Sequence, residues 1–261
     1  MTRLLSIRTG LSIASLLISQ ILMGNFAHGL AGDSDVTERS WQMIGTGYKP
    51  GTQEVLFYEY HNFILDGDGY IVGRYVEYHL PDHTLKSVKQ LDYSKAAPWT
   101  PSFSYDDQEV GYQVGVEVTA TSARLYRYSE KTSLEEITLP LSTNTVVDAG
   151  FDAFIQRAWA RLEEDQEVSF EVFAPLKLDS YQFSLKMNNQ SEGTCYLQMA
   201  LDWWPVDLFI SPVKLEYDCA TRRILRYQGI TNLRDRNHDQ YTADIHYQWM
   251  GEYPPFRFAS E

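Results

Sequence analysis

The hydrophobic pattern of this chain is that of β-strands from residue 54 to 129 and again after residue 167. Short runs rich in aromatic and β-branched residues are each bounded by Pro, Gly, Asn or Asp, which is typical of antiparallel strands. The runs 54–65 (EVLFYEYHNFIL) and 70–80 (YIVGRYVEYHL) flank the turn 66–69 (DGDG) and predict a hairpin. Residues 96–110, which include Pro98 and Pro101, are predicted to leave the sheet. Further strands are predicted at 85–93, 111–120, 122–129, 167–173, 181–188, 194–201, 213–217, 222–229 and 244–250.

A helical pattern occurs once in the predicted domain. After Val147, apolar residues recur at the spacing of one helix face, which predicts an amphipathic helix over about 148–163 with Asp148 as its N-cap. The apolar positions are Phe151, Phe154, Ile155, Ala158, Trp159 and Leu162. About ten antiparallel strands with one helix predict a mainly β (α+β) fold, either a strongly curved antiparallel sheet or a partly closed β-barrel, because curling or closure limits exposed edges.

The first thirty residues have the pattern of an export signal. Arg3 and Arg8 precede the uncharged stretch 11–24 (LSIASLLISQILMG), which is too short to cross a bilayer comfortably. We predict a signal peptide over 1–29, with cleavage between 29 and 32, and a single β-rich domain over 34–261. A retained anchor helix is the alternative. Asp33 follows Leu-Ala-Gly where a lipoprotein would carry cysteine, so a periplasmic protein without lipid or a stable membrane span is expected.

The charge of the chain limits its partners. The formal net charge is −13, and removal of the two leader arginines makes it −15. Such a surface disfavours nucleic acid and anionic membranes as partners.

Two cysteines, Cys195 and Cys219, follow the leader. In an oxidising compartment such a pair predicts a disulfide, with two free thiols or half of a metal site as the alternatives. Antiparallel pairing of 194–201 with 213–219 places Cys195 directly opposite Cys219. The next turn then places Glu216 opposite Arg223, so the basic run 222–226 (RRILR) is interpreted as a charge-balanced hairpin face.

Four segments carry a resemblance to known proteins: 54–63 (EVLFYEYHNF), 76–94 (VEYHLPDHTLKSVKQLDYS), 149–183 (AGFDAFIQRAWARLEEDQEVSFEVFAPLKLDSYQF) and 211–235 (SPVKLEYDCATRRILRYQGITNLRD). Together they resemble an uncharacterised family of exported bacterial β-rich proteins. No activity is assigned to that family, so the resemblance does not point to particular catalytic residues. The order of meandering strands, one helix and a late strand pair is more distantly similar to the LolA/LolB-like lipoprotein-carrier half-barrel. That likeness implies a curled sheet able to hold acyl chains.

The first hairpin supplies a candidate polar site. If residue 66 pairs with 69, His61 lies opposite Arg74, with Glu59 on the same face. These three groups form a polar spot within an apolar cavity if that face is internal. The alternative, favoured because charged residues on one sheet face usually meet water, is a solvated outer ladder. His79 falls on the opposite face from His61, so the two do not form a metal pair.

The segment 202–212 (DWWPVDLFISP) supplies a second candidate. Trp203, Trp204 and Phe209 are too apolar for an exposed loop, and they are interpreted either as core filling or as a lid that lines a pocket. Asp235-x-Asn237-x-Asp239 has the alternating oxygens of a calcium loop but lacks its glycine and bidentate glutamate, so a polar turn is expected.

The sequence lacks the usual signatures of serine hydrolases, zinc proteases and phosphate-binding loops. The leading hypothesis is therefore a non-enzymatic periplasmic carrier or binding protein for an apolar or acyl-bearing ligand, with no cofactor or metal. The alternative is an acidic envelope module that docks a partner protein. A hydrolase built on Glu59, His61 and Arg74 is the weakest of the three hypotheses.

Overall fold

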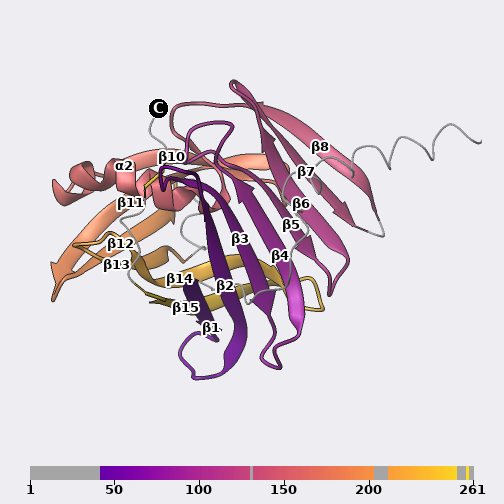
Figure 1. The fold of residues 1–261 in the computed structure, drawn as a ribbon, viewed down its shortest axis with the longest axis horizontal. Coiled ribbons are helices and arrows are strands. Elements are labelled where there is room, and N and C mark those ends of the chain that lie inside the picture. Colours follow the sequence, from indigo (N-terminus) through magenta and orange to yellow (C-terminus); the bar gives the residue numbers. More distant parts are fainter. Residues whose placement is uncertain (1–41, 130–131, 203–210, 252–256, 259–261) are drawn as a thin grey trace, which may run out of the picture. The chain divides into compact units, whose positions relative to one another are not determined.

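Fifteen strands form one sheet in the computed structural model, which describes residues 42–129, 132–202, 211–251 and 257–258 (Figure 1). The first eight strands are β1 (Met43–Tyr48), β2 (Val55–Leu65), β3 (Ile71–His79), β4 (Leu85–Asp92), β5 (Ser102–Asp107), β6 (Tyr112–Val118), β7 (Ser122–Ser129) and β8 (Thr132–Pro140). The others are β9 (Thr145–Val146), β10 (Val168–Ala174), β11 (Asp179–Ser191), β12 (Thr194–Leu201), β13 (Val213–Asp218), β14 (Ile224–Arg234) and β15 (Gln240–Trp249). A 3₁₀ turn, η1 (Asp148–Gly150), leads into the helix α2 (Phe151–Glu163).

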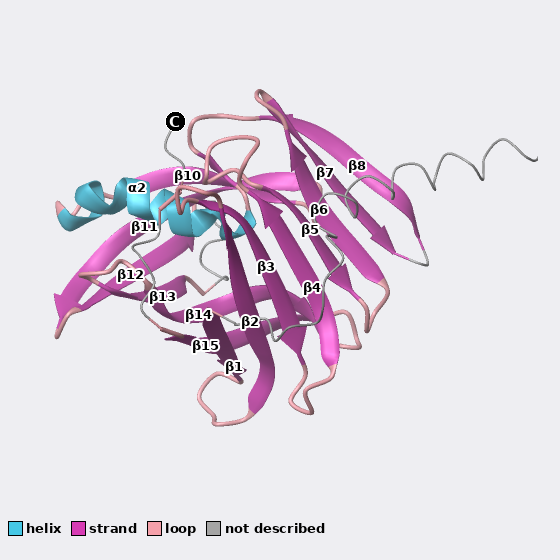
Figure 2. Cartoon of the chain, viewed as in Figure 1, coloured by secondary structure: helices cyan, strands magenta, loops and turns pink. Residues whose placement is uncertain are grey.

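The strand order is β8-β7-β6-β5-β4-β3-β2-β1-β15-β14-β13-β12-β11-β10-β9. Strand β1 pairs with both β2 and β15, so it joins the N-terminal meander to the C-terminal one. Every pairing is antiparallel except that of β9 with β10. The sheet curls on itself without closing, and its two edges are β8 and β9 (Figure 2). The predicted fold class, a curved antiparallel sheet with one helix, is confirmed.

Four strands were not predicted, and each lacks the expected pattern for a physical reason. In β1 the buried positions between Met43 and Tyr48 are glycines. A side chain on Gly47 would come within 2.6 Å of the Phe57 ring, which already fills that space. Strand β5 begins directly after Pro101, within the region predicted to leave the sheet. Strand β8 is exposed on both faces, and β9 has only two residues.

The helix buries the predicted face. Its buried residues include Phe154, Ile155 and Trp159. The Phe154 ring packs on Phe170 of β10, with centroids 4.8 Å apart, and the Trp159 ring packs on Tyr217 of β13, with centroids 6.0 Å apart. Figure 2 shows α2 alongside β10 and β11.

The predicted N-cap of the helix is wrong. Asp148 lies in η1 with a φ of 43°, and its carboxylate binds Lys89 at 2.8 Å. Gly150 occupies the N-cap position, and no side chain caps the helix there. A buried lysine therefore takes the carboxylate that the sequence pattern had assigned to the helix N-terminus.

The disulfide between Cys195 and Cys219 is confirmed, with a Cα–Cα distance of 5.3 Å, but the predicted register is wrong. Cys195 pairs with Tyr217, two residues before Cys219. In the next hairpin, Glu216 pairs with Arg226 instead of Arg223, and the two side chains lie 3.1 Å apart. Arg222 has a φ of 55° and belongs to a longer turn, so β14 begins only at Ile224.

Candidate functional site

The inner face of β2 and β3 carries Glu59, His61 and Arg74, and it is buried. The three residues are between 3% and 6% exposed, so the predicted solvated outer ladder is wrong. His61 pairs with Val76, and Arg74 pairs with Phe63, because the ladder shifts at a bulge after Ile64. Arg74 nevertheless reaches His61 diagonally across the two strands.

Hydrogen bonds join these three side chains in a line. The Nε2 atom of His61 lies 3.1 Å from Oε2 of Glu59, and Nε and Nη2 of Arg74 lie 3.3 and 3.0 Å from Nδ1 of His61. A guanidinium can only donate, so Nδ1 must accept and Nε2–H must donate to the carboxylate. The geometry therefore assigns the neutral Nε2–H tautomer to His61.

The line continues to a residue that the sequence analysis missed. Nη1 of Arg74 donates to Oδ2 of Asp152 at 2.9 Å, and the hydroxyl of Tyr217 donates to Oδ1 of Asp152 at 3.3 Å. At the other end, the hydroxyl of Tyr247 donates to Oε2 of Glu59 at 3.1 Å. The network thus joins β2, β3, α2, β13 and β15, and the one available signal for Asp152 was an acid in the first turn of a predicted helix.

Burial and neighbouring charge set the protonation states of the network. Burial, with Arg74 second, lowers the pKa of His61 from 6.5 to about 4, so the imidazole is neutral at pH 7. Burial alone would lower the pKa of Arg74, but the facing Asp152 carboxylate raises it, and the guanidinium stays charged. Burial and the nearby Asp152 carboxylate raise the pKa of Tyr217. Burial and the nearby Glu59 carboxylate raise the pKa of Tyr247. Both hydroxyls therefore remain donors.

A second buried ionic group joins the start of β4 to the end of β5. Lys86 is fully buried between Asp107 and Glu109, at 3.2 and 2.8 Å, and Glu109 also binds Arg236 at 2.7 Å. An open groove of about 450 Å³ lies beside it and is lined by Leu80, Pro81, Asp82, Glu109, Asp235, Arg236, Asn237 and Tyr241.

The calcium-like segment forms a polar turn. Oδ1 of Asp235 accepts from the backbone N–H groups of Asn237 and Asp239 at 2.8 and 3.0 Å. Across the described ranges, the structure holds no cluster of three or more side chains suited to a metal ion. None of the described helices has the length and apolar character needed to cross a bilayer.

The predicted lid lies largely outside the described residues. Trp203, Trp204 and Phe209 fall within 203–210, so their role in lining a pocket stays a prediction.

The network around His61 is suited to holding the core together. It contains an imidazole between a carboxylate and a guanidinium, which resembles an oriented base. A substrate would reach these groups only if the core opened, because none is more than 6% exposed. Its evident effect is to tie the two halves of the curled sheet to α2.

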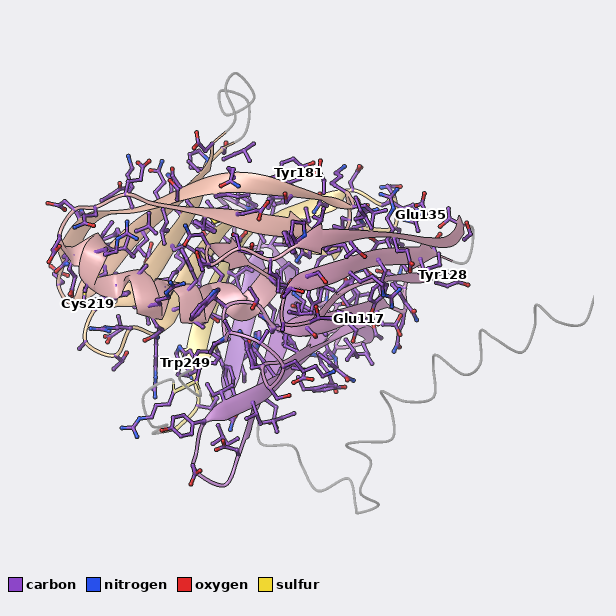
Figure 3. All side chains as sticks on the ribbon, turned by 90° about the horizontal axis from the view of Figure 1, so that it is seen from above. Glu117, Tyr128, Glu135, Tyr181, Cys219 and Trp249 are labelled. Carbon is purple, nitrogen blue, oxygen red and sulfur yellow. A yellow bond between two sulfur atoms is a disulfide. The ribbon has the colours of Figure 1, made fainter. Side chains whose placement is uncertain are left out.

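The open edge at β8 has the opposite character. Every residue from Thr132 to Thr138 is exposed, and Leu134 and Ile137 are 53% and 38% exposed. Figure 3 places Glu135 and Tyr128 together at the end of the β7–β8 hairpin, far from Cys219. The edge at β9 contrasts with it, since both residues of that short strand are buried.

These features define a β-rich protein with a curved, unclosed, largely antiparallel sheet and buried ionic groups around His61 and Lys86. No family model matches its sequence, and no curated protein matches it. A structural likeness is found to a β-barrel-like protein of the domain of unknown function DUF1849 from Brucella abortus, at 7% identity and a TM-score of 0.37, over 80% of this chain and 94% of that one. The description of that protein assigns it no activity, so the function of this chain is inferred from its own residues.

Proposed function

We propose that this protein is a non-enzymatic interaction module of the cell envelope, which binds a partner protein by adding one of the partner's strands to β8. The observation that carries the proposal is the unbroken exposure of β8 from Thr132 to Thr138 at the edge of an unclosed sheet. Among the described strands, β8 has a neighbour, β7, on one side only. A strand in that position presents backbone N–H and C=O groups to any extended segment that fits.

The side chains of this edge favour selective pairing. Glu135 and Glu136 place charge in the middle of the strand, and Pro140 ends it. Such features protect an edge from indiscriminate aggregation. Leu134 and Ile137 still offer apolar surface on the two faces, which a bound segment would cover.

An oxidising compartment agrees with the Cys195–Cys219 bond, because disulfides persist in exported proteins and are rare where thiols are kept reduced. The predicted leader supports the same compartment. The net charge of −13 also suits docking to a partner better than binding to nucleic acid.

The carrier function predicted from the sequence needs an apolar cavity that a ligand can enter. The Glu59–His61–Arg74 group does not supply one, since its polar atoms bind one another within the core. That function stays a prediction.

The test is site-specific photo-crosslinking in intact cells. A photoreactive residue at Thr138, on the edge, should capture a discrete partner, whereas the same residue at the exposed Thr242 of the interior strand β15 should not. The double variant Leu134→Lys/Thr138→Lys blunts the edge and should abolish capture from a probe at Ser133. The variant Thr242→Lys should leave that capture unchanged.

Thermal unfolding of the blunted variant checks that the sheet remains intact. Capture that is absent at Thr138, equal at Thr242, or unaffected by the two lysines would overturn the proposal.

A further inference from the structure

We infer that the segment received by β8 is an extended strand with two adjacent basic residues between two apolar ones. The inference rests on the proposed function and assigns the chemistry of the partner. It follows from which side chains β8 presents on each face and from the charges around them.

The four central residues of β8 alternate between the faces of the sheet. Ile137 pairs with Leu125, which is fully buried, so Ile137 and Glu135 lie on the core side. Leu134 and Glu136 lie on the outer side. Each face of the edge therefore carries one acidic and one apolar residue, and an added strand meets the order apolar, acidic, acidic, apolar.

The arginines near the edge are already engaged. Arg127 binds Oε2 of Glu135 at 2.7 Å, and Arg124 binds both Glu136, at 2.5 Å, and Glu117, at 2.7 Å. Three carboxylates thus share two guanidinium groups, which leaves a formal charge of −1 in a strongly acidic chain. Glu135 and Glu136 are each about half exposed, so an arriving cation can contact them without being buried.

The same two glutamates disfavour pairing between two copies of this chain. In an antiparallel pairing centred on this segment, Glu135 or Glu136 of one copy faces a glutamate of the other. Like charges directly opposite each other destabilise a strand pair. The occupant is therefore a segment of a different protein, with Lys or Arg opposite each glutamate.

The required order is the same in either direction. Read parallel or antiparallel to Leu134–Ile137, the complement is apolar, basic, basic, apolar. A strand pair gains from opposite charges and from apolar contacts at directly facing positions.

The experiment is a selection of random displayed peptides on the purified full chain. Peptides that carry the apolar–basic–basic–apolar order should be enriched, and bound peptide should protect the backbone amides of β8 from hydrogen exchange. The variant Glu135→Gln/Glu136→Gln should weaken the selected peptides roughly fivefold and reduce the salt dependence of binding, since two exposed ion pairs are lost. The matched control Glu54→Gln/Glu192→Gln removes two exposed acids elsewhere and should change neither.

Enriched peptides without a basic pair, equal binding to both glutamine variants, or a selection that yields no peptide protecting β8 would each overturn the inference. If any of these occurs while capture from the probe at Ser133 is still abolished by the edge lysines, the assigned chemistry fails and the proposed function stands. If crosslinking at Thr138 itself fails, the proposed function fails.

Discussion

Lowering the pH from 7 to 5 should destabilise this protein through His61. The pKa of His61 is about 4 in the folded protein, against 6.5 for an unperturbed histidine, so the unfolded chain binds more protons between those pH values. The stabilising effect of a neutral His61 is therefore complete above pH 6.5 and is lost as the pH falls toward 4. With these two pKa values, linkage predicts a loss of about 2 kcal/mol in the free energy of unfolding between pH 7 and 5.

The groups facing His61 explain why it resists protonation. Arg74 donates to Nδ1 from β3, Glu59 accepts from Nε2 on β2, and Lys89 is a more distant cation on β4. A second proton on the ring would have to be placed at Nδ1, against a guanidinium and away from water. Glu59 favours the charged ring, but burial and Arg74 outweigh it.

The assay is urea unfolding of the wild type and of His61→Gln at pH 7, 6 and 5. Glutamine can donate to Glu59 and accept from Arg74 but does not titrate, so the difference between the two proteins should shrink by about 2 kcal/mol over this range. A difference between wild type and His61→Gln that stays constant within about 0.5 kcal/mol would refute the reasoning.

Three further predictions concern the frame of the protein. Replacing Cys195 and Cys219 by alanine should cost about 3.5 kcal/mol by the chain-entropy estimate for a sequence separation of 24, measured by urea unfolding; two alkyl adducts on unreduced folded wild type would contradict the bond itself. Lys86→Met should cost about 3–5 kcal/mol, because it leaves a buried carboxylate 3.2 Å away without its cation; a loss under about 1 kcal/mol in the same assay would contradict this. Gly115→Ala should lower stability by about 1–3 kcal/mol, since the new Cβ would lie 2.5 Å from the backbone carbonyl oxygen of Phe103 on the adjacent strand β5. Gly67→Ala meets open space and should be neutral. Equal melting temperatures for the two variants would refute this prediction.

The local elements of this fold could largely be predicted from the sequence. The strands at 54–65 and 70–80, the helix after Val147 and the partnership of Cys195 with Cys219 were all identified correctly. Each depends on a short-range signal: alternation within a strand, a helical repeat, or a lone pair of cysteines.

The exact residue pairing between neighbouring strands was harder to predict than which residues lie on the same face of the sheet. The predicted register was wrong by two residues both for His61 with Arg74 and for Cys195 with Cys219, yet each pair still lies on a common face. A shift of two residues preserves alternation, whereas bulges and turn lengths decide the exact partners. The β13–β14 hairpin is a further example, since Arg222 adopts a left-handed φ in a longer turn and Glu216 pairs with Arg226 instead of Arg223.

By itself, the sequence determined which residues share a face of each strand and that one helix would cover part of the sheet. Only the tertiary structure decided which face is internal and which strand ends the sheet. Glu59 became internal because Tyr247, 188 residues away, binds it, and Arg74 because Asp152, 78 residues away, neutralises it. Strand β8 is an edge because, among the described strands, it pairs with β7 alone. Burial and edge position are properties of those distant contacts, and the pattern within a single strand does not contain them.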